Sequence, residues 1–145
     1  MPSPAPTTLP DPVRRFLGER RFASIATVDA DGTPRQAVIW YRLDGDHLVL
    51  NSLEGRRWPT NLRRDPRISI AITDAHETSW VGINGIAEVV EDQATAQADI
   101  AAMARFYHAD DPDYAERLIR SRFETQRRVS FRIRPTAIHD HLEDD

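Results

Sequence analysis

The chain has 145 residues and a formal net charge of -4, and its 19 basic residues are all arginine. Because lysine and cysteine are absent, it can offer no Schiff-base catalyst, no lysine for a phosphate-binding loop, no disulfide, no thiol nucleophile and no cysteine metal cluster. The length fits one domain, and the acidic net charge opposes nucleic-acid binding. No apolar run approaches the ~20 residues of a membrane span, and no signal-peptide pattern is present. We therefore expect a cytoplasmic protein.

The predicted elements begin after a proline-rich lead-in, residues 1–8, which we expect to be disordered. A short helix follows, with Asp11 as its cap and Pro12 in its first position; its apolar face comprises Val13, Phe16 and Leu17. Strand patterns then dominate, and six strands are predicted at residues 22–28, 35–43, 47–51, 68–73, 80–90 and 129–134. Within the fifth strand, Gly82 and Gly85 suggest a bulge or a close approach of two backbones.

Helical patterns interrupt the strands at three places. A short helical break at residues 59–65 follows the third strand, and two helices precede the last strand, capped by Asp92 and Asp111. A meander of about six strands closes most easily as a small antiparallel barrel, with the helices covering one end or side. The acidic residues from 139 onward are expected to form a loose tail.

Residues 35–43 are apolar on both faces. Ala37, Ile39, Tyr41 and Leu43 alternate on one side, while Val38 and Trp40 lie on the other. A strand that packs only one face against its own core needs apolar side chains on that face alone. The second apolar face therefore fits a dimer interface. We therefore expect a homodimer.

The segment from Asn51 to Arg67 carries the clearest chemical signal. It holds five arginines and two acids on an acidic chain, and it passes from a strand through Gly55 into a helix near Pro59. Backbone amides at a helix start favour a bound anion, and Arg56 and Arg57 could add forked hydrogen bonds to a phosphate. The alternative is a solvated charge run in which the arginines pair with Glu54 and Asp65.

Three stretches give the chain a family resemblance. They are residues 22–34, residues 55–57 with 61–67, and residues 82–89. Over roughly residues 9–140 the chain resembles the split-barrel flavin- and deazaflavin-binding superfamily, whose best-known branch is the pyridoxamine phosphate oxidases. It is most similar to the actinobacterial F-420-dependent oxidoreductases of the B type, and all-arginine usage is typical of such GC-rich genomes.

The resemblance implies a fold and a set of site residues. The fold is a mostly β, six-stranded antiparallel split β-barrel with flanking helices, one domain over residues 9–140 with an acidic tail at 141–145, which forms a homodimer with cofactor sites at the interface. The strand after Pro34 would run along the cofactor ring, and the following strand and loop would hold its phosphate. The cofactor-binding positions that follow are Val38, Ile39, Trp40, Asn51, Ser52, Arg56, Arg57, Trp58, Asn61 and Trp80.

Two tryptophans among these positions have alternatives. Trp80 stands where the family often has an aromatic residue near the ring or substrate, but it also fits a barrel core. Trp58 occupies the position where the related deazaflavin enzymes usually have a lysine, two residues after the first loop arginine. Tryptophan can stack on a ring or cover a phosphate pocket but carries no charge, so Arg57 is the candidate to supply that charge. This departure puts the cofactor's identity in question more than the fold.

The function that we expect is an enzyme, an F-420-dependent oxidoreductase that passes a hydride to a small organic acceptor. The alternatives are an FMN-binding oxidase or reductase of the same superfamily and a non-catalytic cofactor- or haem-binding protein on the same barrel. A nucleic-acid binder is disfavoured by the net charge, and no membrane partner is expected.

The catalytic acid stays unassigned. Tyr41 is better explained as a buried sheet residue than as a proton donor. His139 and His141 are better explained as solvated side chains than as metal ligands, so we expect no metal site. Arg127 and Arg128, which precede the last strand, would either approach the cofactor tail or pair on the surface.

Overall fold

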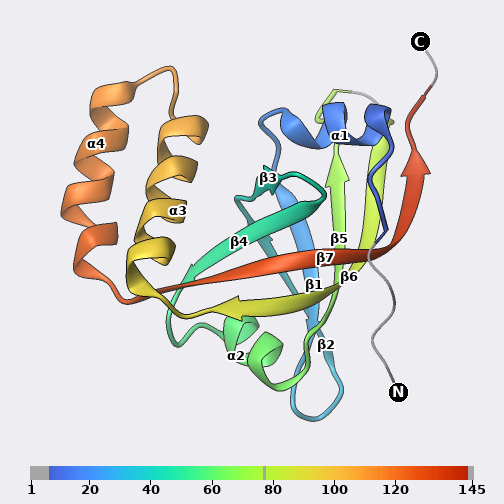
Figure 1. The fold of residues 1–145 in the computed structure, drawn as a ribbon, viewed down its shortest axis with the longest axis horizontal. Helices are drawn as coiled ribbons and strands as arrows, with labels where there is room; N and C mark the ends of the chain where they lie inside the picture. The colour runs from blue at the N-terminus through green and yellow to red at the C-terminus, as the bar shows by residue number, and fades with distance from the viewer. Residues whose placement is uncertain (1–6, 77, 144–145) are drawn as a thin grey trace.

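The computed structural model describes residues 7–76 and 78–143 of this protein (Figure 1). These residues form one seven-stranded antiparallel sheet and four α-helices. The strands are β1 (Ala23–Val28), β2 (Pro34–Ile39), β3 (Arg42–Asp44), β4 (His47–Leu53), β5 (Arg67–Thr73), β6 (Trp80–Val90) and β7 (Arg128–His141). The helices are α1 (Asp11–Gly18), α2 (Arg57–Arg64), α3 (Gln93–Tyr107) and α4 (Pro112–Ser121), with a short 3-10 helix η1 (Phe123–Thr125). The predicted mostly β, antiparallel fold class is confirmed.

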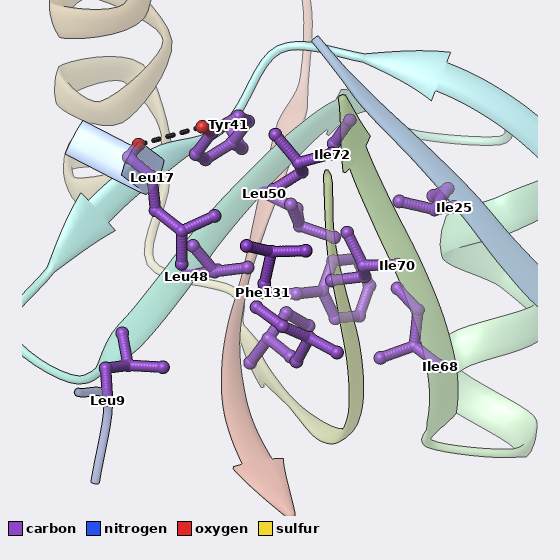
Figure 2. Packing of buried hydrophobic residues seen from close by; sticks show 14 of the residues in the cluster. Leu9, Leu17, Ile25, Tyr41, Leu48, Leu50, Ile68, Ile70, Ile72 and Phe131 are labelled. Carbon is purple, nitrogen blue, oxygen red and sulfur yellow. Dashed lines mark hydrogen bonds between the residues drawn. The ribbon is translucent and has the colours of Figure 1, made fainter. Parts of the chain in front are cut away.

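The strands are ordered β2-β1-β5-β6-β7-β4-β3 across the sheet, and the sheet curls toward a barrel (Figure 1). Its two edge strands, β2 and β3, are consecutive in the chain and are joined only by Trp40 and Tyr41. The single strand predicted over residues 35–43 is therefore wrong, and the predicted count of six strands becomes seven. The strand is interrupted at Tyr41. The backbone N–H of Tyr41 donates to the Tyr107 hydroxyl (3.1 Å), and the Tyr41 hydroxyl donates to the carbonyl of Leu17 (2.8 Å, Figure 2). Neither hydrogen bond belongs to the pairing of two strands.

The main core fills the inside of this curled sheet. Alternate residues of neighbouring strands point inward, as expected from the period of two along a strand. They include Ile25, Leu48, Leu50, Ile68, Ile70, Ile72 and Phe131, which Figure 2 shows packed together. Helix α1 closes one end of the barrel with its predicted apolar face, Val13, Phe16 and Leu17, and α2 lies at the other end (Figure 1). The prediction that Asp11 caps this helix is wrong, because Asp11 is already its first residue, Pro10 holds the cap position and no side chain caps the first turn.

Helices α3 and α4 form a hairpin at the side of the barrel, where α3 contacts β4 and β7 (Figure 1). A second apolar cluster fills this contact; it contains Val49, Ile100, Met103, Ala104, Tyr107 and Ile119. The predicted caps of α3 and α4 are confirmed, because Asp92 accepts a hydrogen bond from the amide of Thr95 (3.1 Å) and Asp111 accepts one from the amide of Tyr114 (3.1 Å). None of the helices in the described part of the chain is long and apolar enough to cross a membrane.

Strands β6 and β7 make the longest pairing of the sheet. The predicted close approach at Gly85 is confirmed: a β-bulge lies between Asn84 and Gly85, and a Cβ on Gly85 would lie 2.7 Å from Cγ2 of Ile133. The prediction of a loose tail from residue 139 is wrong for residues 139–141, since β6 is long enough to pair Trp80 with His141. Residues 1–6 of the predicted lead-in and residues 144–145 of the tail lie outside the described residues, whereas the Thr7 amide donates to the Pro135 carbonyl (2.8 Å).

Candidate cofactor-binding site

A pocket of about 450 Å³ lies between the barrel and the α3–α4 hairpin. Its walls are mostly apolar or aromatic, which is typical of small-molecule and cofactor sites. The barrel side contributes Phe22, Val38, Ile39 and Trp40, and the helical side contributes Ile100, Met103, Tyr114, Leu118 and Phe123. The polar lining consists of Asn51, Arg56, His108, Arg122, Gln126 and Arg128.

Trp40 anchors the aromatic part of the pocket. Its ring stacks on Tyr107, with centroids 4.9 Å apart and an interplanar angle of 8°. The Tyr107 hydroxyl is fixed in turn by the carbonyl of Arg21 and by the backbone of Tyr41. The rings of His108 and Trp40 pack in a T-shaped arrangement, with their centroids 5.5 Å apart. Because its neighbours hold the indole in place, Trp40 gives the pocket a rigid aromatic surface on which a planar ring can pack.

Arginine gives the polar lining of the pocket a positive charge. Arg128 is only 4% exposed, and among the residues that the structure describes it forms no ion pair with a carboxylate. Burial, with a smaller contribution from the positive charge of Arg56, lowers the pKa of Arg128 to about 10, so the side chain stays cationic at neutral pH. A buried cation without a counter-ion is costly, and a bound anion would relieve that cost.

Three of the five arginines in the 51–67 segment form ion pairs with nearby carboxylates. Arg57 pairs with Asp29 (3.4 Å), Arg63 pairs with Glu54 (3.0 Å) and Glu91, and Arg67 pairs with Asp65 (2.6 Å). The alternative prediction, that loop arginines pair with Glu54 and Asp65, is thus confirmed for Arg63 and Arg67. Arg56, in contrast, lines the pocket and forms no ion pair within the described residues.

Comparison with known proteins identifies the family. A model of the pyridoxamine 5'-phosphate oxidase family matches residues 9–142. The chain belongs to this family. Similar solved structures include an F420 reductase (22% identity, TM-score 0.72, covering 90% of this chain and 98% of that one) and a conserved hypothetical protein from Mycobacterium tuberculosis (23%, 0.75, 97% and 91%). The haem storage protein HutZ from Vibrio cholerae is also similar (21%, 0.66, 92% and 95%). These structures share the split-barrel fold with this chain and so confirm the predicted fold, while the family match confirms the predicted superfamily.

Five of the ten predicted cofactor-binding residues line the pocket of this family member: Val38, Ile39, Trp40, Asn51 and Arg56. Ser52 does not, although it follows Asn51 directly. Successive strand residues point to opposite faces of a sheet, so Asn51 faces the helices, where it bonds to Ala96, while Ser52 is buried opposite Val129.

Three more predicted residues lie on or beside α2, away from the pocket. Trp58 is buried in the barrel core against Phe131 (5.8 Å between ring centroids). The amide of Asn61 donates to Thr27 (3.1 Å) and to Asp29 (2.8 Å), which fastens α2 to the first hairpin. Arg57 also reaches Asp29 and so does not supply the pocket with the charge that lysine gives related enzymes.

Trp80, the tenth residue, stacks on His141 at the far end of β6 and does not line the pocket of this chain (centroids 4.1 Å apart). His139 and His141 belong to β7, and no group of three metal-ligating side chains is found in the described residues. Tyr41 is buried as predicted; burial raises the pKa of its hydroxyl, and it lies outside the pocket.

Sequence reasoning missed most of the helical side of the pocket and left Arg128 open. Met103 and Leu118 have the spacing of ordinary helix-core residues, and His108 follows the end of α3 with no motif around it. Their contact with the barrel depends on where the hairpin docks, which no local pattern encodes. The one usable signal was the arginine pair before the last strand, of which Arg128 enters the pocket.

Proposed function

We propose that this protein is an oxidoreductase that binds the deazaflavin coenzyme F-420 in the pocket and transfers hydride to a small organic acceptor. The observation that carries the proposal is the pairing of a rigid aromatic wall with two arginines, Arg56 and Arg128, that have no carboxylate partner among the described residues. This donor set fits a ligand with a planar ring at one end and a phosphate at the other.

The chain's own residues would bind, orient and shield the cofactor. Arg56 and Arg128 would hold the phosphate through charge-assisted hydrogen bonds, while Trp40, with Val38 and Ile39, would pack along the ring. The α3–α4 hairpin would exclude water from one side. When bound, the deazaflavin ring supplies the hydride chemistry, and the protein supplies position and environment. A cytoplasmic location, expected from the sequence, is part of this proposal.

FMN is the second cofactor that this pocket fits, because it also joins a planar ring to a phosphate. The replacement of the usual lysine by Trp58 favours neither cofactor by contact, since Trp58 is buried in the core and does not line the pocket. We prefer F-420 because the loop motif resembles that of the deazaflavin enzymes and because one similar structure is an F420 reductase.

A haem-binding role is favoured by one observation. His108 lines the pocket, and its imidazole makes no hydrogen bond to another described residue, so it is available as an axial ligand. The haem storage protein HutZ shares the fold. This role would make the protein a carrier instead of an enzyme.

We also propose that the protein works as a homodimer whose second copy completes the site. Phe22 and Val38 line the pocket, and yet they are 60% and 70% exposed. Exposed apolar side chains at the rim of a pocket are typical of a surface that another protein covers.

Titration of the purified protein with F-420, FMN and haem separates these functions. We expect micromolar F-420 binding, negligible FMN binding, and acceptor-dependent oxidation of reduced F-420 on a panel of small organic acceptors. Preference for FMN would refute the cofactor assignment. Tight haem binding that His108→Ala abolishes, without turnover on any acceptor, would replace the enzyme with the haem carrier.

A further inference from the structure

A continuous line of hydrogen bonds leads from the pocket to a carboxylate that lies outside it. Asp99, on α3, is not part of the pocket lining, and its side chain is only 12% exposed. One of its oxygens, Oδ1, accepts a hydrogen bond from the guanidinium of Arg42 (2.9 Å), and the other, Oδ2, accepts one from the hydroxyl of Ser130 (2.7 Å). Ser130 lies on β7 two residues after Arg128, so Asp99 contacts the strand that carries Arg128.

The carboxylate fixes the direction of every bond that follows. Because an ionised carboxylate can only accept, the Ser130 hydroxyl must donate to Asp99, which leaves the Ser130 oxygen to accept from Nδ2 of Asn51 (2.9 Å). The second Nδ2 proton of Asn51 goes to the carbonyl of Ala96 (2.9 Å). The oxygen of the Asn51 amide is thereby turned toward Arg128, whose Nε donates to it (3.0 Å).

The opposite orientation of the Asn51 amide is excluded by the same partners. A flipped amide would set its oxygen against the Ala96 carbonyl, where two acceptors would meet, and its NH₂ group against Nε of Arg128, where two donors would meet. Asn51 and Ser130 are directly opposite each other on the paired strands β4 and β7, so the bond between them needs no flexible reach.

The relay holds the Arg128 guanidinium without neutralising it. Nε is bound to Asn51, and Nη1 donates to Gln126 (2.6 Å). Within the part of the chain that the structure describes, no acceptor binds Nη2. The backbone of Arg128 is fixed as well, since the Gln93 side chain accepts from its N–H (3.0 Å) and donates to its carbonyl (2.7 Å).

We propose that Asp99 is a positioning residue for the cofactor site: through Ser130 and Asn51 it orients the Arg128 guanidinium to bind the anionic group of the ligand. A carboxylate in direct contact with Arg128 would orient it too, but it would compete with the ligand for the charge. Asp99 acts from a distance and leaves the charge available. This inference rests on the proposed function, in which the pocket binds a phosphate-bearing cofactor.

Two variants interrupt the relay at different points. Ser130→Ala removes the hydroxyl that accepts from Asn51, and Asp99→Asn introduces an NH₂ group that can donate to Ser130 in competition with Nδ2 of Asn51, so both variants weaken the hold of Ser130 on the amide that binds Arg128. Asp44→Asn is the matched control, because Asp44 also binds an arginine of β7, Arg132 (3.0 Å), but has no contact with the relay. Thermal unfolding confirms that each variant is folded before it is used.

The first measurement needs no cofactor. Hydrogen exchange of the Arg128 Nε–H is followed by NMR, with the signal assigned by its loss in Arg128→Lys. We expect exchange to be at least about tenfold faster in Asp99→Asn and Ser130→Ala than in the wild type, and unchanged in Asp44→Asn, since a released hydrogen bond exposes its proton to solvent. Unchanged exchange in both relay variants would overturn the proposal; if Asp99→Asn does not fold, Ser130→Ala decides alone.

The second measurement compares F-420 with the corresponding deazaflavin alcohol that lacks the phosphate. We expect both relay variants to bind F-420 about tenfold more weakly and to bind the phosphate-free ring as the wild type does. An equal loss for both ligands would indicate a general structural role and would overturn the proposal. If the wild type binds neither F-420 nor FMN while the exchange result holds, the proposed function is refuted and the relay itself is supported.

Discussion

At the scale of single residues, Arg56 and Arg57 are neighbours in the chain with different partners. Arg57 lies in the first turn of α2 and turns toward Asp29 (3.4 Å), which also binds Arg35 (2.9 Å). Arg56 precedes the helix and lines the pocket, where its positive charge contributes to lowering the pKa of the buried Arg128. Two like charges that share a pocket raise the cost of the free site, and an anion bound between them lowers it.

The first prediction follows from this difference. Arg56→Ala should weaken F-420 binding by about 1–3 kcal/mol, because it removes a charge-assisted hydrogen bond to the phosphate. Arg57→Ala is the control and should leave the affinity unchanged. Fluorescence titration of both variants measures the effect. Equal affinities for Arg56→Ala and the wild type would mean that the phosphate binds elsewhere.

The pocket could be predicted from the sequence only where one contiguous segment builds it. The run from Val38 to Trp40 was found because the family resemblance places the strand after Pro34 along the ring, and Arg56 was found because local charge and the same resemblance mark it. Arg128 could not be assigned, since its surroundings come from Asn51, 77 residues away in the chain, and from α3. Trp58 occupies a family position that usually holds lysine, but it lies on the inward face of α2, so its indole is buried in the core.

At the scale of elements, Asp29 joins three parts of the fold. It lies in the turn after β1, binds Arg35 of β2 through its carboxylate, and accepts a hydrogen bond from Asn61 of α2 (2.8 Å). The hydrogen bond from Arg35, followed by that from Asn61, lowers the pKa of Asp29 to about 2 from 3.8. Its negative charge is therefore part of what holds α2 against the first hairpin.

The second prediction is the pH dependence of that contribution. A carboxyl group whose pKa is lower in the folded than in the unfolded state stabilises the fold above its unfolded pKa. The stabilisation by Asp29 should be complete above about pH 4 and lost as the pH falls toward about 2. Urea unfolding of the wild type and Asp29→Asn across this range measures it: their difference in unfolding free energy should shrink toward pH 2.

The control for this experiment is Arg57→Ala, which removes the weakest of the interactions that lower the Asp29 pKa. It should keep the pH dependence of the wild type. A difference between wild type and Asp29→Asn that stays constant from pH 6 to pH 2 would contradict the prediction.

The elements themselves were predicted well where the signal is local. The alternation of Ile68, Ile70 and Ile72 defined β5, and the caps Asp92 and Asp111 defined the starts of α3 and α4. The errors arose where distant pairing decides. The break at Tyr41 depends on Tyr107, and the extension of β7 to His141 depends on the length of β6. Neither partner is close enough in sequence to leave a local pattern.

At the scale of the whole molecule, a strand at the edge of the sheet carries an apolar side chain that is exposed to solvent. β2 is an edge strand of the sheet, and Val38 on it is 70% exposed while also lining the pocket. Edge strands with apolar side chains tend to pair with another chain. A second copy that covered Phe22 and Val38 would protect this edge and close the pocket at the same time, so assembly and cofactor binding would be coupled.

The third prediction tests that coupling. Val38→Asp should weaken the homodimer by at least about tenfold, because a charge at the centre of an apolar interface must be desolvated, and it should weaken F-420 binding with it. The fold of the protomer should be unaffected, since substitutions of exposed side chains are usually within about 0.5 kcal/mol. Light scattering after size-exclusion chromatography measures the mass. Val89→Asp, at an apolar position on β6 that is 39% exposed and outside the pocket, is the control and should stay dimeric. A wild type that is monomeric at all concentrations tested, or a Val38→Asp variant that keeps both the dimer and its affinity for F-420, would refute the second copy's part in the site.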